Sequence, residues 1–202
     1  EGSFYGRVEI DGNTGTIKKI TEPLVRQLAE DLVVERGIIF PGFVDLHIHA
    51  REDESGQQVY KENFDTAARA ALHGGVVCAA DMPNNPIAPA DDEMYLAKQK
   101  LARAKPIDFL LYAAIGPDTN PLSFSVPYKV FMGPSVGPLF FENFAQLEQT
   151  IKQYRGCFVS FHCENPEMLQ ENRRPPEAEV SAIECALMLI EKYKLQGKIC
   201  HC

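Results

Sequence analysis

The sequence predicts an α/β fold with a mostly parallel sheet, preceded by a small all-β segment. From residue 41 onward, strand-like apolar runs alternate with helix-like segments, which is the pattern of consecutive βα units. These runs are almost continuously apolar, as in strands that are covered on both faces. Residues 1–40 contain only strand-like segments. We therefore divide the chain into an N-terminal part, residues 1–40, and a main part, residues 41–202.

The N-terminal part predicts three or four short strands. The segment FYGRVEIDGNTGTIKKI places an Asp-Gly-Asn turn between two strand-like runs, which is a hairpin signature. The segment DLVVERGIIF, residues 31–40, adds another short apolar strand pair.

The main part predicts about six strands, each a short run of mainly aliphatic and aromatic residues. In order, these strands span residues 42–48, 76–82, 107–116, 128–133, 157–162 and 198–202.

Four helices are predicted between these strands, over residues 61–75, 90–104, 142–156 and 175–197. The first has an alanine-rich body and ends at Gly74 and Gly75, a common C-cap arrangement. The second begins with acidic residues and ends with basic ones, as the helix dipole favours. The third carries an apolar stripe at helical spacing: Phe144, Leu147, Ile151 and Tyr154. The fourth is expected to end at Gly197.

The number of strands leaves two architectures open. A closed eight-stranded α/β barrel takes roughly 250 residues. In this chain of 202 residues, 162 follow residue 40. The pattern alone therefore fits either a complete, open doubly wound sheet or a barrel that is cut short.

Composition and charge limit the partners. The net charge is −8 and no run of lysine or arginine forms a basic patch, which argues against nucleic acid and anionic membranes but not against a small anionic substrate. No apolar run could span a bilayer and no signal peptide is visible.

No CxxC motif occurs, so buried free thiols in a reducing cytoplasm are expected. The six cysteines are Cys78, Cys157, Cys163, Cys185, Cys200 and Cys202.

Four of the five histidines are placed at predicted strand ends, where α/β folds carry their chemistry. His47 and His49 end the first strand of the main part, and residues two apart on a strand point to the same face. His162 and His201 end the fifth and sixth strands. An isolated HxH pair is usually incidental, but three separate strand ends favour a metal site, because neutral imidazole is a preferred zinc ligand. His73 lies at the end of a helix and is expected to be structural.

Lys129 and the cysteines next to the histidines each allow two interpretations. Lys129, in the short segment YKVFMG, is either a lysine that extends to solvent or one converted by carbon dioxide into a carboxylate that bridges two metals. Alternation along the last strand places Cys200 and Cys202 opposite His201, so the cysteines are interpreted as core residues.

Taken together, the segments GFVDLHIHARE, DMPNNP, YKVFMG, FHCEN, RRPPEAE and CHC resemble the amidohydrolase superfamily. Within it, the chain is most similar to the cyclic amidohydrolases, and among these to the dihydroorotases. The HxHxR and MPN motifs are the specific part, and the resemblance covers nearly the whole chain. It implies a (β/α)8 TIM barrel of the metal-dependent hydrolase type, here truncated after about six strands, with a small β-sandwich to which residues 1–40 contribute.

The resemblance also implies roles for individual residues. His47 and His49 would bind the more buried of two zinc ions, and His162 and His201 the second. Carboxylated Lys129 would bridge the two ions together with a hydroxide. Arg51 and Asn84 would hold the substrate carboxylate, although Asn84 alone would be interpreted as a turn residue. The family's catalytic aspartate is expected beyond Cys202.

The activity implied is the reversible interconversion of N-carbamoyl-L-aspartate and L-dihydroorotate in pyrimidine biosynthesis. The resemblance implies a cytoplasmic homodimer, and it also allows association with a transcarbamoylase. Three alternatives remain open. The first is another cyclic amidohydrolase, such as an allantoinase or dihydropyrimidinase. The others are a non-catalytic dihydroorotase-like scaffold and an inactive fragment.

Overall fold

The computed structural model describes residues 6–22, 38–135, 139–170 and 173–201, and the chain separates into two compact units, residues 1–41 and 42–202. In the first unit, strand β1 (Arg7–Ile10) pairs antiparallel with strand β2 (Ile17–Thr21), which confirms the predicted hairpin. The Asp11 carboxylate organises the turn by accepting hydrogen bonds from the backbone N–H groups that follow it. Most of the strand pair predicted over residues 31–40 lies outside the described residues.

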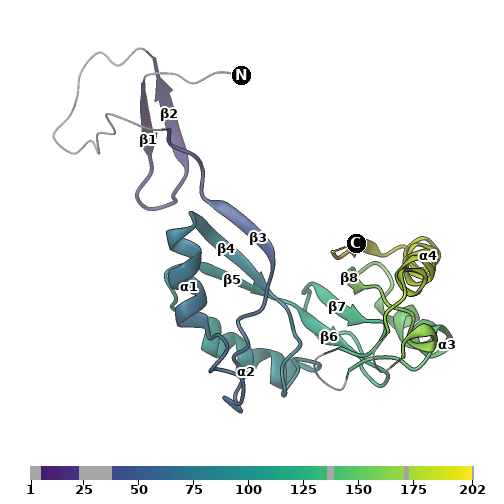
Figure 1. Ribbon diagram of the computed structural model, residues 1–202. Helices are drawn as coiled ribbons and strands as arrows, with labels where there is room; N and C mark the ends of the chain where they lie inside the picture. Colours follow the sequence, from purple (N-terminus) through teal and green to yellow (C-terminus); the bar gives the residue numbers. More distant parts are fainter. Residues whose placement is uncertain (1–5, 23–37, 136–138, 171–172, 202) are drawn as a thin grey trace. The chain divides into compact units, whose positions relative to one another are not determined.

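The second unit contains two parallel sheets (Figure 1). The first has the order β3–β4–β5 and the second the order β6–β7–β8–β9. This confirms the predicted alternation of helices with parallel strands. The strands are β3 (Phe43–Ile48), β4 (Val76–Asp81), β5 (Asp108–Leu111), β6 (Ala113–Ile115), β7 (Tyr128–Phe131), β8 (Phe158–His162) and β9 (Gln196–Ile199).

One predicted strand is divided between the two sheets. The run 107–116 was expected to be a single strand, but it forms β5 and β6, separated at Tyr112. The Tyr112 N–H donates to the Asp81 carbonyl at the end of β4, whereas the next N–H, that of Ala113, donates to the Pro127 carbonyl just before β7. The chain therefore changes its pairing partner within two residues, and this change ends one sheet and begins the other.

The four predicted helices are present, with capping residues that explain where they begin. Helix α1 (Phe64–His73) and helix α2 (Asp92–Ala102) start after Asn63 and Asp91, whose side chains accept hydrogen bonds from backbone N–H groups of the first turn. Helix α3 (Phe144–Ile151) continues as a 3-10 turn over Lys152–Tyr154, and helix α4 (Pro176–Tyr193) has proline in its first turn.

The predicted end of α4 at Gly197 is wrong. The helix stops at Tyr193, because Lys194 takes a left-handed conformation (φ +54°) that an α-helix cannot continue. Gly197 lies instead within β9, where a Cβ atom would fall only 2.2 Å from the Cδ1 atom of Ile190. The glycine is therefore explained by close packing between strand and helix rather than by capping.

The main core lies between the second sheet and the helices α3 and α4, which contact each other (Figure 1). The predicted stripe of α3 is part of this core, with Leu147, Ile151 and the following Tyr154 fully buried. A smaller apolar cluster of Ala68, Ala79 and Ile107 joins α1 to the first sheet. The polar side chains of the site lie instead at the carboxyl ends of the strands, as His49 after β3 and His162 at the end of β8.

The described cysteines are free thiols. Cys163, Cys185 and Cys200 are buried, as predicted, but Cys78 and Cys157 are partly exposed. Among the described residues, no helix is long and apolar enough to cross a bilayer.

Candidate active site

The histidine pair of β3 and the histidine after β9 lie together. The ring centroid of His47 is 5.2 Å from that of His49 and 5.3 Å from that of His201. The two strand ends are also linked directly, because the Lys198 ammonium donates to the Leu46 carbonyl at 3.2 Å. Residues about 150 positions apart in the sequence are thereby brought to one place.

His162 and His201 form the second pair. Their ring centroids are 4.8 Å apart, and the Nδ1 atom of His162 lies 3.2 Å from the Nε2 atom of His201. His162 ends β8, whereas His201 lies beyond β9 with a positive φ of +35° and is exposed. All four predicted histidines therefore belong to one chain of neighbouring rings, from His49 through His47 and His201 to His162.

Lys129 lies below this chain of rings, in β7, and is almost fully buried, with 1% of its surface exposed. Its ammonium has no hydrogen-bond partner of good geometry among the described residues, although the thiols of Cys200 and Cys163 act on it electrostatically. Burial lowers the pKa of Lys129, because the interior disfavours its charged form. Of its two predicted interpretations, a lysine that extends to solvent is excluded.

Cys200 departs from the expected alternation. It is buried, but its thiol interacts with Lys129, so it lies on the side of the histidines and not opposite His201. The reason is that β9 ends at Ile199, and the strict alternation of a strand no longer applies to the two residues that follow.

The surroundings favour the neutral forms of His47, His49 and His162. Burial, helped by the nearby Lys129 and His49, lowers the pKa of His47 to about 4. Burial also lowers the pKa values of His49 and His162, opposed in each case by a hydrogen bond to a neighbouring side chain. Neutral imidazole is the form that binds a metal ion.

Arg51 and Asn84 meet beside His49. The Arg51 Nη1 atom donates to the Asn84 backbone carbonyl at 3.3 Å, and the Asn84 side-chain oxygen lies 2.8 Å from His49 Nδ1. Arg51 has a φ of +61°, a left-handed conformation that is uncommon for a residue with a side chain. The predicted carboxylate-binding pair is thus in contact with the predicted metal ligands.

The donor set fits zinc in its chemistry. Within the described part of the chain, no three histidine, cysteine, aspartate or glutamate side chains converge closely enough to hold a metal ion. However, two imidazoles use one nitrogen on Asn84 or Glu164, which orients the other nitrogen of each ring as in known metal sites. A buried amine without a good acceptor lies beside them. Neutral imidazoles around a convertible lysine are residues that suit a zinc centre.

Sequence reasoning missed two ion pairs that contact this site. In the first, Glu164 Oε2 lies 3.0 Å from His162 Nε2 and also pairs with the exposed side chain of Arg174. In the second, Asp81 at the end of β4 pairs with Lys98 of α2. The available signal for the second was a lysine on the buried side of α2, between Tyr95 and Ala102.

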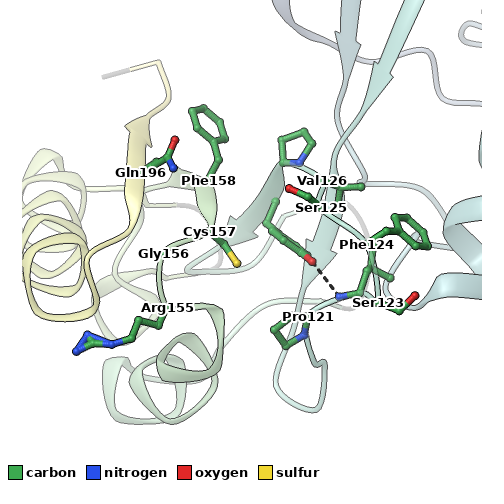
Figure 2. Close-up of a pocket in the computed structure, with 13 residues that line it drawn as sticks. Pro121, Ser123, Phe124, Ser125, Val126, Arg155, Gly156, Cys157, Phe158 and Gln196 are labelled. Carbon is green, nitrogen blue, oxygen red and sulfur yellow. Dashed lines mark hydrogen bonds between the residues drawn. The ribbon is translucent and has the colours of Figure 1, made fainter.

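A hollow of the second unit lies away from these residues. It has a volume of about 650 Å³ and lies at the amino ends of β7, β8 and β9, near Tyr128, Phe158 and Gln196 (Figure 2). The Tyr128 hydroxyl accepts a hydrogen bond from the Leu122 N–H at 2.9 Å in its wall. Because the histidines follow the opposite, carboxyl ends of the strands, we assign the chemistry to the strand ends and not to this hollow.

Comparisons with known proteins give several relatives of the same kind. The chain is 35% identical to a dihydroorotase of Thermococcus kodakarensis over 99% of its length and 49% of the relative's. It is 35% identical to a dihydroorotase of Pyrococcus abyssi, over 98% and 48% of the two lengths. A dihydroorotase of Pyrococcus furiosus is 32% identical, over 100% and 48%. The chain spans about half the length of the curated relatives it matches.

Solved structures and the family profile agree on the fold. The L-hydantoinase (dihydropyrimidinase) of Arthrobacter aurescens superposes with a TM-score of 0.70 at 20% identity, over 92% of this chain and 47% of that one. The D-hydantoinase (dihydropyrimidinase) of a Thermus species gives a TM-score of 0.67 at 19% identity, over 91% and 46%. The profile of the Amidohydrolase family matches residues 38–196, and the chain belongs to that family.

Proposed function

We propose that the protein containing this chain is a zinc-dependent dihydroorotase that interconverts N-carbamoyl-L-aspartate and L-dihydroorotate. The observation that carries the proposal is the meeting of four histidines and a buried lysine with an arginine–asparagine pair at the strand ends. The dihydroorotase relatives support the same assignment.

In this proposal His47 and His49 would hold one zinc ion, His162 and His201 would hold the second, and carboxylated Lys129 would be a ligand of both. The bound metal would supply a Lewis acid and a water of lowered pKa near neutral pH. Within this chain, Asn84 and Glu164 keep the rings of His49 and His162 oriented through hydrogen bonds to their second nitrogen atoms.

The surroundings of Lys129 favour its carboxylation. An amine reacts with carbon dioxide only in its neutral form. A new N–C bond then forms, and the amine loses a proton to solvent. Burial lowers the pKa of Lys129, which increases the fraction of the neutral amine. The product is an anionic carboxylate, which places an oxygen ligand among the imidazoles.

Arg51 and Asn84 are proposed to bind the substrate carboxylate. A guanidinium offers a planar pair of donors that matches a carboxylate. Asn84 uses its side-chain oxygen on His49, which leaves its amide nitrogen to donate to the substrate. A carboxylate held there would place the ring amide beside the histidines and limit its approach to one orientation.

The larger assembly belongs to the same proposal. The parallel strands and the similarity to the hydantoinase structures support a (β/α)8 barrel, which would close beyond the strands of this chain and carry a β-sandwich. By the same resemblance we propose a catalytic aspartate on a later strand, a cytoplasmic homodimer, and association with a transcarbamoylase.

The test is a substrate panel on the purified, zinc-loaded full-length protein. Ring opening is measured with dihydroorotate, allantoin and dihydrouracil, before and after Arg51→Ala. The expected result is turnover of dihydroorotate that Arg51→Ala strongly weakens. Turnover of allantoin or dihydrouracil that is indifferent to Arg51 would instead identify another cyclic amidohydrolase. A protein that binds zinc and opens none of the three rings would be a scaffold.

A further inference from the structure

The ion pair of Asp81 and Lys98 is the most deeply buried charged pair that the structure describes. The Asp81 side chain is 0% exposed and the Lys98 side chain 3%. The Nζ atom lies 2.6 Å from Oδ2 but off the direction of a good hydrogen bond, so their attraction is mainly Coulombic. Removing two charges from water is costly, and packed apolar residues often serve stability equally well. The pair therefore calls for a role other than stability.

One end of the pair holds the backbone next to Arg51. The Asp81 Oδ1 atom accepts a hydrogen bond of 2.7 Å from the N–H of Ala50, which is itself fully buried. Ala50 separates His49 from Arg51, the residue with the left-handed φ of +61°. The hydrogen bond fixes the chain immediately before this strained residue, where a small rotation would move the guanidinium.

The other end holds the turn that contains Asn84. The Lys98 ammonium donates to the side-chain oxygen of Asn85 and approaches the Met82 carbonyl at 3.5 Å. Asn85 is 1% exposed, so the ammonium satisfies a polar group that water does not reach. One lysine therefore fixes the turn on both sides of Asn84.

Two further contacts join the two loops to each other. The Asp53 carboxylate accepts from the Ile87 N–H at 2.8 Å, and the Asn85 side-chain nitrogen approaches the Glu52 carbonyl at 3.5 Å. Asp53 is also buried, with 4% of its surface exposed. The loop after β3, which carries Arg51, and the loop after β4, which carries Asn84, are thus joined in one polar network that includes the ion pair.

We propose that Asp81 and Lys98 are positioning residues that set the distance and direction between Arg51 and Asn84, and thereby the affinity for the substrate carboxylate. The inference rests on the proposed function, because it assumes that this pair receives the carboxylate of an anionic cyclic amide. Neither Asp81 nor Lys98 touches the substrate. They act through the Ala50 N–H and the Asn85 side chain.

The test compares two variants with a matched control in the zinc-loaded full-length protein. Lys98→Met removes the ammonium, and Asp81→Leu combined with Lys98→Met removes both charges and the acceptor of the Ala50 N–H while keeping a side chain of similar shape, which guards against a misfolded single variant. Lys105→Met is the control, because Lys105 pairs with Asp65 near the surface and contacts neither loop. The kinetic readout is kcat and KM for dihydroorotate.

The variants are expected to raise KM about tenfold while kcat changes by less than about threefold, because the lost interaction affects binding of the carboxylate more than the reacting amide. The control should match the parent protein. If kcat falls by as large a factor as KM rises, and the Tm falls in parallel, the pair is merely structural and the inference is overturned.

Amide hydrogen exchange separates this inference from the proposed function. If the parent protein does not open dihydroorotate, the proposed function fails, but exchange at Ala50 can still be measured. Faster exchange at Ala50 in the double variant, with the Tm unchanged, supports positioning. Exchange at Ala50 that equals that of the control contradicts positioning, whatever the substrate is.

Discussion

The two halves of the candidate site support their key residues in opposite ways. Beside the first sheet, the carboxylate of Asp81 and its partner Lys98 are 0% and 3% exposed. Beside the second sheet, the carboxylate of Glu164 and its partner Arg174 are 17% and 61% exposed. Each carboxylate contacts the predicted site, one through the Ala50 N–H and the other through His162 directly.

This difference indicates different tasks for the two halves. A buried polar network holds its groups in one arrangement, which suits recognition of a rigid substrate group. An exposed ion pair contributes little to stability and adjusts easily, because water screens it. Groups that acquire their final arrangement only when metal binds can tolerate such support. We therefore expect substitutions of the buried pair, Asp81 and Lys98, to change substrate affinity and substitutions of the exposed pair, Glu164 and Arg174, to change metal affinity.

The largest effect is expected at Lys129, because its substitution should affect both proposed zinc ions and not one half of the site alone. Lys129→Met keeps the apolar stem but removes the amine, so no carboxylate can form to hold either metal. Without the metal ions, the transition state loses several kcal/mol of stabilisation, which corresponds to a fall of about 10³-fold in kcat/KM. The checks are the activity with dihydroorotate and the zinc content per chain. The exposed Lys192→Met serves as control, and full activity of the Lys129 variant would refute a bridging role.

The next effect is expected at Arg51. Arg51→Lys keeps the charge but loses the planar pair of donors, so KM for dihydroorotate should rise about 10- to 100-fold. The zinc content should stay at the parent value, because the guanidinium is assigned to the first half only. A simultaneous loss of zinc would show that the two halves are not separable.

A smaller effect on the other side is expected from Glu164→Gln. Partners that hydrogen-bond to a metal-binding histidine typically contribute 10- to 100-fold to metal affinity. Because Glu164 is supported only by the exposed Arg174, the expected loss is near tenfold. Zinc affinity is measured by competition with a chelator. Arg174→Met should weaken zinc less, since Arg174 touches only Glu164 among these groups. If the zinc affinity is unchanged in both variants, Glu164 has no role in metal binding.

The smallest effect concerns the core behind the second half. Burial raises the pKa of Tyr154 to about 12, from an ordinary value near 10. The unfolded chain therefore releases this proton first, so the contribution of Tyr154 to stability is complete below pH 10 and is lost as the pH rises toward 12. Tyr154→Phe should flatten the loss of stability over that range in denaturant titrations. It should cost about 1 kcal/mol at neutral pH, through the lost hydrogen bond to Thr119. The exposed Tyr60→Phe should leave the whole profile unchanged.

Much of the fold could be predicted, because local sequence determines where strands and helices lie. The apolar runs placed the described α-helices and most of the described strands within a few residues. The break at Tyr112 could not be predicted, since it depends on which neighbouring strand each N–H meets. The end of α4 was placed wrongly because Gly197 satisfies a packing requirement that resembles a capping signal in the sequence.

For the site, the sequence predicted the residues at the strand ends but not those that support them. His47, His49, His162 and His201 follow apolar runs, so their meeting could be anticipated. Lys98 follows no such rule, since a lysine within an amphipathic helix ordinarily faces water. Its burial depends on Asp81, which precedes it by 17 positions and lies in a different element. Supporting residues of this kind become visible only when the two elements are seen in contact.

The left-handed backbone of Arg51 implies a trade-off between stability and activity at this position. A side chain at φ +61° costs free energy that asparagine would largely avoid. Arg51→Asn is therefore expected to make the protein more stable, by about 1 kcal/mol, while it weakens substrate binding. On this view the protein tolerates a strained arginine because no relaxed residue at this position offers a guanidinium, and its stability is lower than the same fold could reach.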